Sequence, residues 1–351
     1  MRPAHWRALK WLARRAGRAR SALLVCFALV AVVPSRASAL EADLSRPGVE
    51  GGATRVEVGL FLADLHDVSG SDQAFLADVV LQALWHDPRL AGRWPSVRGV
   101  GLDEVWNPRL QLVNQRGVTT SFPQRVEVDP SGLVRYRQRW LGRFSTRMDL
   151  RDFPLDRQLF GVQVVSLGYS SDEVELVLNS KDLPSGRAGE LSLTDWQIGP
   201  ARIETAAFEP GPGAKLLAGA ALRWEGRRLV GYYAVQVVLP LVLIVLLGWL
   251  ALWVNPAVVP ARVSMSVTAM LTLIAYRFSL GKSVPNLTYL TRFDYFMLGS
   301  TVLVFLSVAV VAAGAYLIDK DRMPLVRRID GWGRVLFPVA LALVFGLAWW
   351  G

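Results

Sequence analysis

The spacing of apolar residues divides the chain into two parts. Between about residues 41 and 228, short runs alternate apolar and polar positions and are separated by Gly, Pro, Ser and Asp, which is typical of half-buried β-strands. The runs cover residues 56–65, 79–85, 133–140, 160–167 and 174–180. This pattern predicts an all-β sandwich with one hydrophobic core over residues 40–228.

The remainder, residues 229–351, is strongly apolar. It predicts a transmembrane domain of four helices at about 232–254, 261–281, 293–318 and 334–350. The stretch between the third and fourth helices carries several Lys and Arg residues, which indicates a cytoplasmic linker. We therefore expect the β-sandwich and the C-terminus to lie on the outer side of the membrane.

The second predicted helix carries a stripe that differs from the rest of its surface. The stripe consists of residues three or four positions apart, which share one helical face: Ser264, Thr268, Leu271, Ala275, Phe278 and Lys282. A polar stripe on a membrane helix predicts that several copies face one water-filled pore. Leu271 and Phe278 are the candidate gate, because converging apolar side chains close a pore by dewetting. Alternatively, the two hydroxyls bond to their own helix.

The formal net charge of +10 does not indicate nucleic-acid binding. Residues 1–39 hold eight Lys or Arg residues and no Asp or Glu, so the rest of the chain carries a formal charge of +2. This segment has an Arg-rich start, an apolar core at residues 22–33 and small residues up to Ala39, the pattern of a secretory signal peptide. An uncleaved anchor helix is the alternative. Cys26, the only cysteine, lies in this segment, so we expect no disulfide in the mature protein.

Several motifs follow one another along the chain in a characteristic order. Residues 148–160 have Phe153, Pro154 and Asp156 at their centre, Trp85 to Leu90 read Trp-x-Asp-x-Arg-Leu, and Trp106 to Pro108 read Trp-x-Pro. Arg228, Pro240 and Pro285 are single landmarks. Together these motifs resemble the pentameric ligand-gated ion channels, the Cys-loop receptors, and their bacterial members in particular, with residues 148–160 as the signature loop. Thr146 and Phe160 stand where animal receptors carry two cysteines.

The resemblance implies a homopentamer in which each subunit has an outer β-sandwich and four helices, the second of which lines the pore. It also implies a small-molecule agonist bound between subunits, a permeant inorganic ion and an integral membrane protein surrounded by lipid. For a bacterial member that membrane is the inner, or cell, membrane. The resemblance implies neither a cofactor nor a nucleic-acid partner.

The inner end of the second helix predicts anion selectivity. Cation-selective relatives carry a glutamate there, whereas Pro260, Ala261 and Arg262 resemble the corresponding stretch of glycine and GABA receptors. Residues 226–293 contain no acidic residue, and Lys282 adds a positive charge at the outer mouth. We therefore expect chloride to be the permeant ion.

By resemblance, the two parts are coupled at the membrane surface. The residues implied are Phe153, Pro154 and Asp156 of the signature loop, Arg228 before the first helix and Pro285 after the second. Asp156 and Arg228 are the implied ion pair.

The agonist site is the least specified feature. Aliphatic residues stand at three positions of the aromatic box that binds amines in relatives: Val80, Val113 and Leu167. Tyr169 and Phe208 are the nearest aromatic residues. Arg135 and Arg137 share one face of a strand, where a carboxylate ligand fits. An ordinary solvated strand face is the alternative.

No motif indicates an enzyme or a metal site. After residue 39 only His66 and His86 remain, and their spacing suits no metal motif. Two other functions stay open. One is a cation-selective or proton-gated channel of the same fold, with His66 as a pH sensor. The other is a non-conducting, membrane-tethered β-domain that binds an extracytoplasmic partner.

Overall fold

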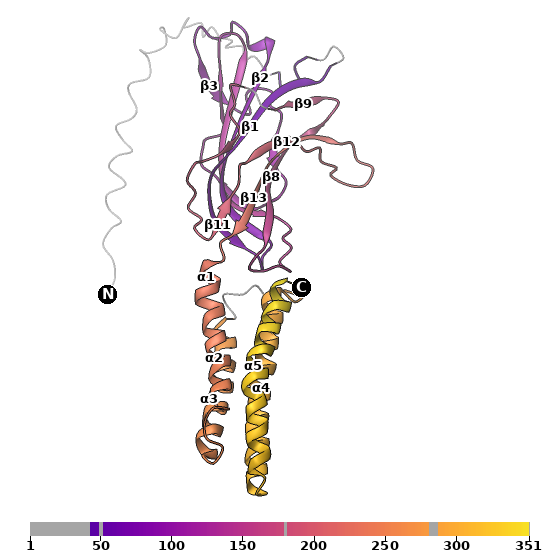
Figure 1. Cartoon of the computed structure of the whole chain (residues 1–351). Helices are drawn as coiled ribbons and strands as arrows, with labels where there is room; N and C mark the ends of the chain where they lie inside the picture. The colour runs from indigo at the N-terminus through magenta and orange to yellow at the C-terminus, as the bar shows by residue number, and fades with distance from the viewer. Residues whose placement is uncertain (1–42, 49–51, 179–180, 281–286, 351) are drawn as a thin grey trace, which may run out of the picture. The chain divides into compact units, whose positions relative to one another are not determined.

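The computed structural model of the chain describes residues 43–48, 52–178, 181–280 and 287–350. The predicted signal peptide, Lys282 and Pro285 lie outside the described residues. Figure 1 shows a domain of strands followed along the chain by a set of long helices. The predicted fold class, a β-sandwich followed by four membrane helices, is confirmed.

Two sheets form the β-domain within the described residues. The first has the order β10-β1-β2-β7-β6-β3, with β5 also paired to β7 and β9 to β1. Its strands are β1 (Thr54–Ser69), β2 (Ala74–His86), β3 (Arg98–Gly101), β5 (Gln115–Thr120), β6 (Arg125–Val128), β7 (Leu133–Ser145), β9 (Val174–Val177) and β10 (Gly186–Arg187). A short 3₁₀ turn, η1 (Pro88–Leu90), follows β2.

The second sheet has the order β11-β13-β8-β4, with β12 also paired to β13. Its strands are β4 (Leu110–Leu112), β8 (Arg157–Ser170), β11 (Trp196–Ile198), β12 (Arg202–Thr205) and β13 (Leu217–Arg228). The last strand ends at Arg228, where the apolar part of the sequence begins.

The core between the sheets follows from the alternation of residues along the strands. In β7, the even-numbered residues from Val134 to Phe144 are buried and the odd-numbered residues from Arg135 to Arg143 are exposed. A period of two places every second side chain on the same face of a sheet. The face with buried residues packs on the second sheet, and the other carries arginines.

An aromatic cluster joins the two sheets. The ring centre of Phe75 on β2 lies 5.4 Å from that of Phe160 on β8 and 5.5 Å from that of Trp224 on β13. Both ring pairs are edge-to-face. Phe160 is fully buried. A side chain at Gly226 would come within 2.7 Å of the Phe160 ring, so only glycine fits there. Each such ring pair contributes about 1 kcal/mol beyond area burial, which stabilises a sandwich without a disulfide.

Within the described residues, four helical segments are long and apolar enough to cross a membrane. The first combines α1 (Gly231–Tyr233), the π-helical turn η2 (Ala234–Val238) and α2 (Leu239–Leu250). The others are α3 (Val259–Leu280), α4 (Arg292–Asp319) and α5 (Met323–Trp350). Helices α2 and α3 are in contact, as are α4 and α5, and both pairs run side by side in Figure 1.

The last helix is longer than predicted. It begins at Met323 and not near residue 334, so most of the predicted cytoplasmic linker is helical. The charges in this stretch lower its hydropathy, but they do not prevent a helix. Arg327 and Arg328 are exposed, whereas Asp330 is buried beside a cationic partner. The prediction from hydropathy alone was wrong here.

The first span is shorter than predicted and ends at Leu250 instead of residue 254. The amides of Leu252 and Trp253 donate to the carbonyls of Trp249 and Leu250, each at 3.0 Å. These are i→i−3 bonds, the tight turns in which helices often end. A local hydrogen-bond pattern of this kind leaves no signal in hydropathy.

The π-helical turn in the first span is tied to α3. Pro240 has no amide hydrogen, so it leaves the carbonyl of Gln236 without its usual helical donor. The hydroxyl of Tyr276 on α3 lies 2.7 Å from the carbonyl oxygen of Val237 and 3.5 Å from that of Gln236. The proline is therefore accommodated by a neighbouring helix, as membrane proteins require.

Candidate functional site

One face of α3 carries five of the residues predicted to line a pore. Ser264, Thr268, Leu271, Ala275 and Phe278 are all exposed, with Leu271 at 62% and Phe278 at 83%. The buried residues of the same helix are Arg262, Ser266, Ala269, Leu273 and Leu280. Neighbouring members of each set lie one or two helical turns apart, so the helix presents one face to its own subunit and leaves the other uncovered.

The hydroxyls of the exposed face are free to meet water. Among the described residues, neither Ser264 nor Thr268 makes a side-chain hydrogen bond. In contrast, Ser266 on the buried face donates to the carbonyl of Arg262 at 3.0 Å. The back-bonding expected of membrane hydroxyls is thus seen on the packed side of α3 and not on its exposed side.

Arg262 does not belong to the exposed face. Its side chain is 2% exposed, and its Nη2 donates to Oδ1 of Asp330 on α5 at 2.5 Å. Its Nε also donates to the carbonyl of Ala251 at 3.3 Å. Within the selectivity stretch implied for Pro260, Ala261 and Arg262, the Arg262 side chain therefore faces its own subunit, where it finds its counter-charge. Pro260 and Ala261 are exposed.

The ion pair implied between Asp156 and Arg228 is present at the base of the β-domain. Arg228 Nε lies 2.9 Å from Asp156 Oδ1, and the two side chains are 6% and 1% exposed. Gln158 Nε2 donates to the other carboxylate oxygen at 2.9 Å. The Arg228 guanidinium also lies 4.3 Å from the centre of the Trp196 ring and 5.1 Å from that of Phe153. A buried charge of this kind needs such partners.

The signature loop contacts the helices through apolar side chains. The peptide bond between Phe153 and Pro154 is cis, and both side chains are buried. The Phe153 ring packs edge-on against Tyr233 of α1 at 5.1 Å and against Phe293 of α4 at 6.4 Å. One loop residue therefore touches the first span and the third.

Polar contacts extend this junction. The backbone amide of Leu150 donates to the Tyr289 hydroxyl at 3.0 Å, and Arg292 Nε donates to Asp152 Oδ1 at 2.7 Å. Sequence reasoning missed Tyr289, Arg292 and the aromatic partners of Phe153. The available signal was an aromatic and a basic residue directly before a predicted helix.

The arginines of β7 differ in their surroundings. Arg139 pairs with Asp78. Arg135 and Arg137 have no ion-pair partner within the part of the chain that the structure describes, and both line a pocket of about 360 Å³. Arg125 and Phe122 line it too, with Glu127 as its one carboxylate. This pocket carries an excess of positive charge.

Tyr169 and Phe208 lie near one end of the second sheet. Ser170, next to Tyr169, pairs with Leu217 of β13, which in turn pairs with Phe208. The Tyr169 hydroxyl accepts a hydrogen bond from Trp106 Nε1 at 2.9 Å. The guanidinium of Arg109 lies 5.9 Å from the centre of the Tyr169 ring. This aromatic ring therefore already has a cation beside it.

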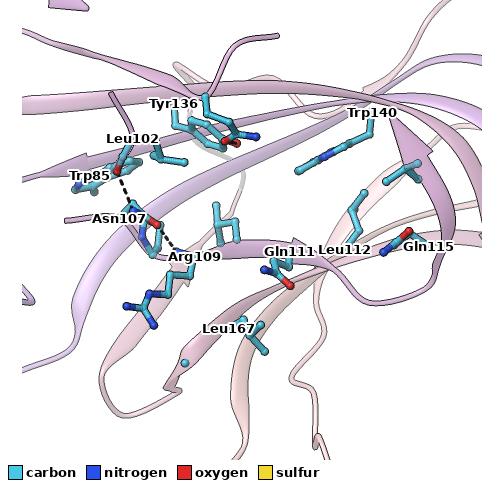
Figure 2. Close-up of a pocket in the computed structure, with 15 residues that line it drawn as sticks. Trp85, Leu102, Asn107, Arg109, Gln111, Leu112, Gln115, Tyr136, Trp140 and Leu167 are labelled. Carbon is cyan, nitrogen blue, oxygen red and sulfur yellow. Dashed lines mark hydrogen bonds between the residues drawn. The ribbon is translucent and has the colours of Figure 1, made fainter. Parts of the chain in front are cut away.

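Arg109 also lines a cavity of about 650 Å³ in the β-domain (Figure 2). The aromatic part of the cavity wall includes Trp85, Tyr136 and Trp140. Burial raises the pKa of the Tyr136 hydroxyl, which keeps its proton and donates to Gln124 Oε1 at 3.3 Å. Sequence reasoning missed Arg109, which has a positive φ of 50°.

The described residues contain no group of three or more His, Cys, Asp or Glu side chains suited to a metal ion. The two parts of the molecule instead offer an exposed helix face and a basic surface on the β-domain.

Two family models match the chain, one for each domain. The neurotransmitter-gated ion-channel ligand binding domain matches residues 42–199, and the neurotransmitter-gated ion-channel transmembrane region matches residues 237–339. Together they cover more than half of the chain.

A curated relative is the gamma-aminobutyric acid receptor subunit beta of Caenorhabditis elegans. It is 28% identical over 310 residues, which cover 80% of this chain and 54% of the relative. The chain thus spans about half the length of that protein. Both domains of the family occur here in the same order, so this integral membrane protein belongs to the neurotransmitter-gated ion channels, the Cys-loop receptor family, and not to a family of enzymes.

Proposed function

We propose that the protein is a homopentameric channel for chloride, opened by a small molecule that binds between the outer domains of neighbouring subunits. The observation that carries this proposal is the exposed face of α3, with two unbonded hydroxyls, Leu271 and Phe278 on one side of a membrane helix. Five such faces around an axis enclose water, and they keep polar groups away from lipid.

The absence of the two cysteines supports placing the chain among bacterial members of the family. In that setting the membrane is the inner one. The basic residues between α4 and α5 and at the start of α5 support an orientation with the β-domain and the C-terminus outside.

Anion selectivity is supported by charge at the inner end of α3. Pro260 and Ala261 are exposed, and neither carries a carboxylate. Among the described residues, the acidic side chain that pairs with this end is Asp330, which is buried against Arg262. An anion that sheds part of its water therefore meets backbone and hydroxyl groups and no negative charge.

We expect a chloride gradient to set the reversal potential. Purified protein in a planar bilayer with asymmetric KCl should give currents that reverse close to the chloride equilibrium potential. Ala261→Glu places a carboxylate from each subunit at the exposed inner end, and it should move the reversal potential toward that of potassium. Val263→Ala, a neutral change at an exposed position two residues further along the helix, is the control.

Each outcome of this recording decides between the functions. Reversal near the potassium potential in the wild-type protein indicates a cation channel. Silence across a range of ligands and pH values, with intact pentamers, supports the tethered binding module instead.

We further propose that the agonist carries a carboxylate. Arg135 and Arg137 line a pocket and have no ion-pair partner among the residues that the structure describes, and Arg109 already lies beside the Tyr169 ring. Guanidinium groups bind carboxylates through paired, charge-assisted hydrogen bonds. A cationic amine would be repelled by the same groups.

Arg137→Ala should weaken activation by a carboxylate agonist about tenfold or more, since a charge-assisted hydrogen bond contributes about 1.5–3 kcal/mol. Arg143→Ala is a matched control, because Arg143 lies on the same exposed face of β7 but near Asp67 and Asp72. Concentration–response curves measure the effect. Equal potency for both variants contradicts the carboxylate proposal.

A further inference from the structure

A buried ion pair links α3 to the outermost part of its own subunit. Arg262 and Asp330 are 2% and 1% exposed, and their side chains meet at 2.5 Å. Helix α5 is the least buried of the four spans. In its apolar stretch 11% of the residues are buried, against 22–28% in the other spans. A buried carboxylate on this helix therefore stands out from its surroundings.

Two other helical segments, α2 and α4, lie beside the pair. Arg262 Nε donates to the carbonyl of Ala251, just after α2, and its Nη1 passes over Gly314 of α4, where an added Cβ would lie 3.9 Å away. Val326, one turn before Asp330 on α5, packs over the same glycine. The guanidinium thus sits where α2, α4 and α5 meet α3.

Helix α5 is held at this level by further contacts. Trp249 Nε1 donates to the carbonyl of Arg334 at 3.2 Å, and Arg334 Nε donates to the carbonyl of Leu252 at 3.1 Å. The Arg334 guanidinium also lies 4.9 Å from the centre of the Trp253 ring. One bond satisfies a carbonyl of α5 and the other a carbonyl just after α2, so the first half of α5 is docked and not merely adjacent.

Arg262 satisfies only one of the two carboxylate oxygens of Asp330. Its second oxygen, Oδ2, is buried and has no hydrogen-bond partner among the described residues. Burying a carboxylate with one oxygen unpaired is costly, and a neutral apolar residue would avoid that cost. A buried aspartate at this position is therefore suited to one role, which is to hold the positive charge of Arg262 in place.

We propose that Asp330 is a positioning residue for ion conduction, which draws the guanidinium of Arg262 off the exposed face and neutralises it. This inference rests on the proposed channel function. In a pentamer it keeps the inner mouth lined by Pro260, Ala261 and Ser264, with no net charge from five Arg262–Asp330 pairs. Selectivity is then set by backbone and hydroxyl groups and not by a ring of arginines.

The test is a double-mutant cycle on the full-length protein with two readouts. Asp330→Asn and Arg262→Gln each leave one buried charge unpaired, and each should lower the midpoint of thermal unfolding in detergent by about 10 °C. The double variant Arg262→Gln/Asp330→Asn should recover most of that loss. Arg328→Gln, an exposed charge on the same turn of α5, should not change the midpoint.

The second readout is chloride current in both directions across the bilayer. Asp330→Asn adds a positive charge per subunit at the inner end and should raise chloride efflux relative to influx about twofold. Arg262→Gln should change the ratio in the opposite direction, and the double variant should resemble the wild type. Arg328→Gln removes a charge but should leave the ratio unchanged.

The two readouts separate the failure of this inference from failure of the channel function. Unchanged midpoints in both single variants overturn the ion pair itself. Lower midpoints with an unchanged current ratio make the pair a structural anchor only and overturn its positioning role. If the wild-type protein carries no current, the proposed function fails, while the unfolding cycle still decides whether the pair exists.

Discussion

Leu271→Ser should produce a channel that opens without agonist. The leucine is 62% exposed on the face of α3 that we propose lines the pore. Five leucines around an axis expel water and close the pore, whereas five serines hold water. If hydration of each side chain favours the open state by about 0.5 kcal/mol, a fraction of what burying a leucine contributes, five of them shift the equilibrium roughly 60-fold.

The measurement is the current in the absence of ligand, together with the agonist concentration for half-maximal activation. Leu343→Ser on α5 is a matched control, since that leucine is 61% exposed and the chemical change is identical. We expect Leu343 to face lipid, where a serine hydroxyl bonds to its own helix and opens nothing. Similar behaviour of the two variants, with neither raising the resting current, contradicts the assignment of Leu271 to the gate.

Phe278 is a second apolar level on the same face and is 83% exposed. In an assembly, a side chain this exposed can lie in one of two places. It either contacts its copies around the pore or packs against the adjacent subunit. The resting current of Leu271→Ser tests whether Phe278 also closes the pore. If it does, the resting current will be smaller than the estimated shift toward the open state predicts.

The parts of the fold that sequence reasoning predicted are those with a local period. In β7 the alternation of Val134, Tyr136 and Trp140 with arginines is visible in the sequence, because a sheet with one buried face imposes a period of two. The stripe from Ser264 to Phe278 was visible for the same reason, with a period near 3.6. Such patterns need no knowledge of the rest of the chain.

The parts that were missed depend on contacts between distant residues. Arg262 was grouped with Pro260 and Ala261 as one selectivity stretch by resemblance, and its partner Asp330 lies 68 residues away. The start of α5 was misplaced because the basic residues up to Arg334 read as a cytoplasmic linker, although α5 already begins at Met323. Charges paired across a bundle leave no trace in hydropathy.

The coupling site was predicted only in part. The ion pair of Asp156 and Arg228 was predicted because a family resemblance supplied both positions, and the structure contains it. The contacts of Leu150 with Tyr289 and of Asp152 with Arg292 were not predicted, because the family motif covers only the loop and an aromatic and a basic residue near the start of α4 are a weak signal by themselves. The motif identified one side of the junction, and only the fold identified the other.

Asp156→Asn should abolish most agonist-evoked current while pentamers still form. The pair it breaks is almost fully buried, with Arg228 held between Trp196, Phe153 and Tyr233. Removing one partner leaves a buried guanidinium without its counter-charge, which costs about 3–5 kcal/mol. The arginine must then move toward water, and it would carry with it the contacts of Phe153 that join the β-domain to α1 and α4.

Asp152→Asn is the matched control, because it changes the same residue type in the same loop and also breaks a pair with an arginine. That pair, with Arg292 at 2.7 Å, has a carboxylate that is 61% exposed. An exposed pair contributes about 0–1 kcal/mol, so activation should shift by less than about fivefold. Size-exclusion chromatography verifies assembly for both variants, and concentration–response curves measure gating.

A charge swap decides whether the pair itself matters or only the space it fills. In Asp156→Arg/Arg228→Asp the two charges face each other in reverse, although the cation then lies on the loop and away from the ring of Trp196. Partial recovery of current relative to Asp156→Asn is the expected result. Normal activation by Asp156→Asn alone would instead show that Phe153 and the Asp152–Arg292 contact carry the movement without the ion pair, because these contacts join the same loop to the same helices.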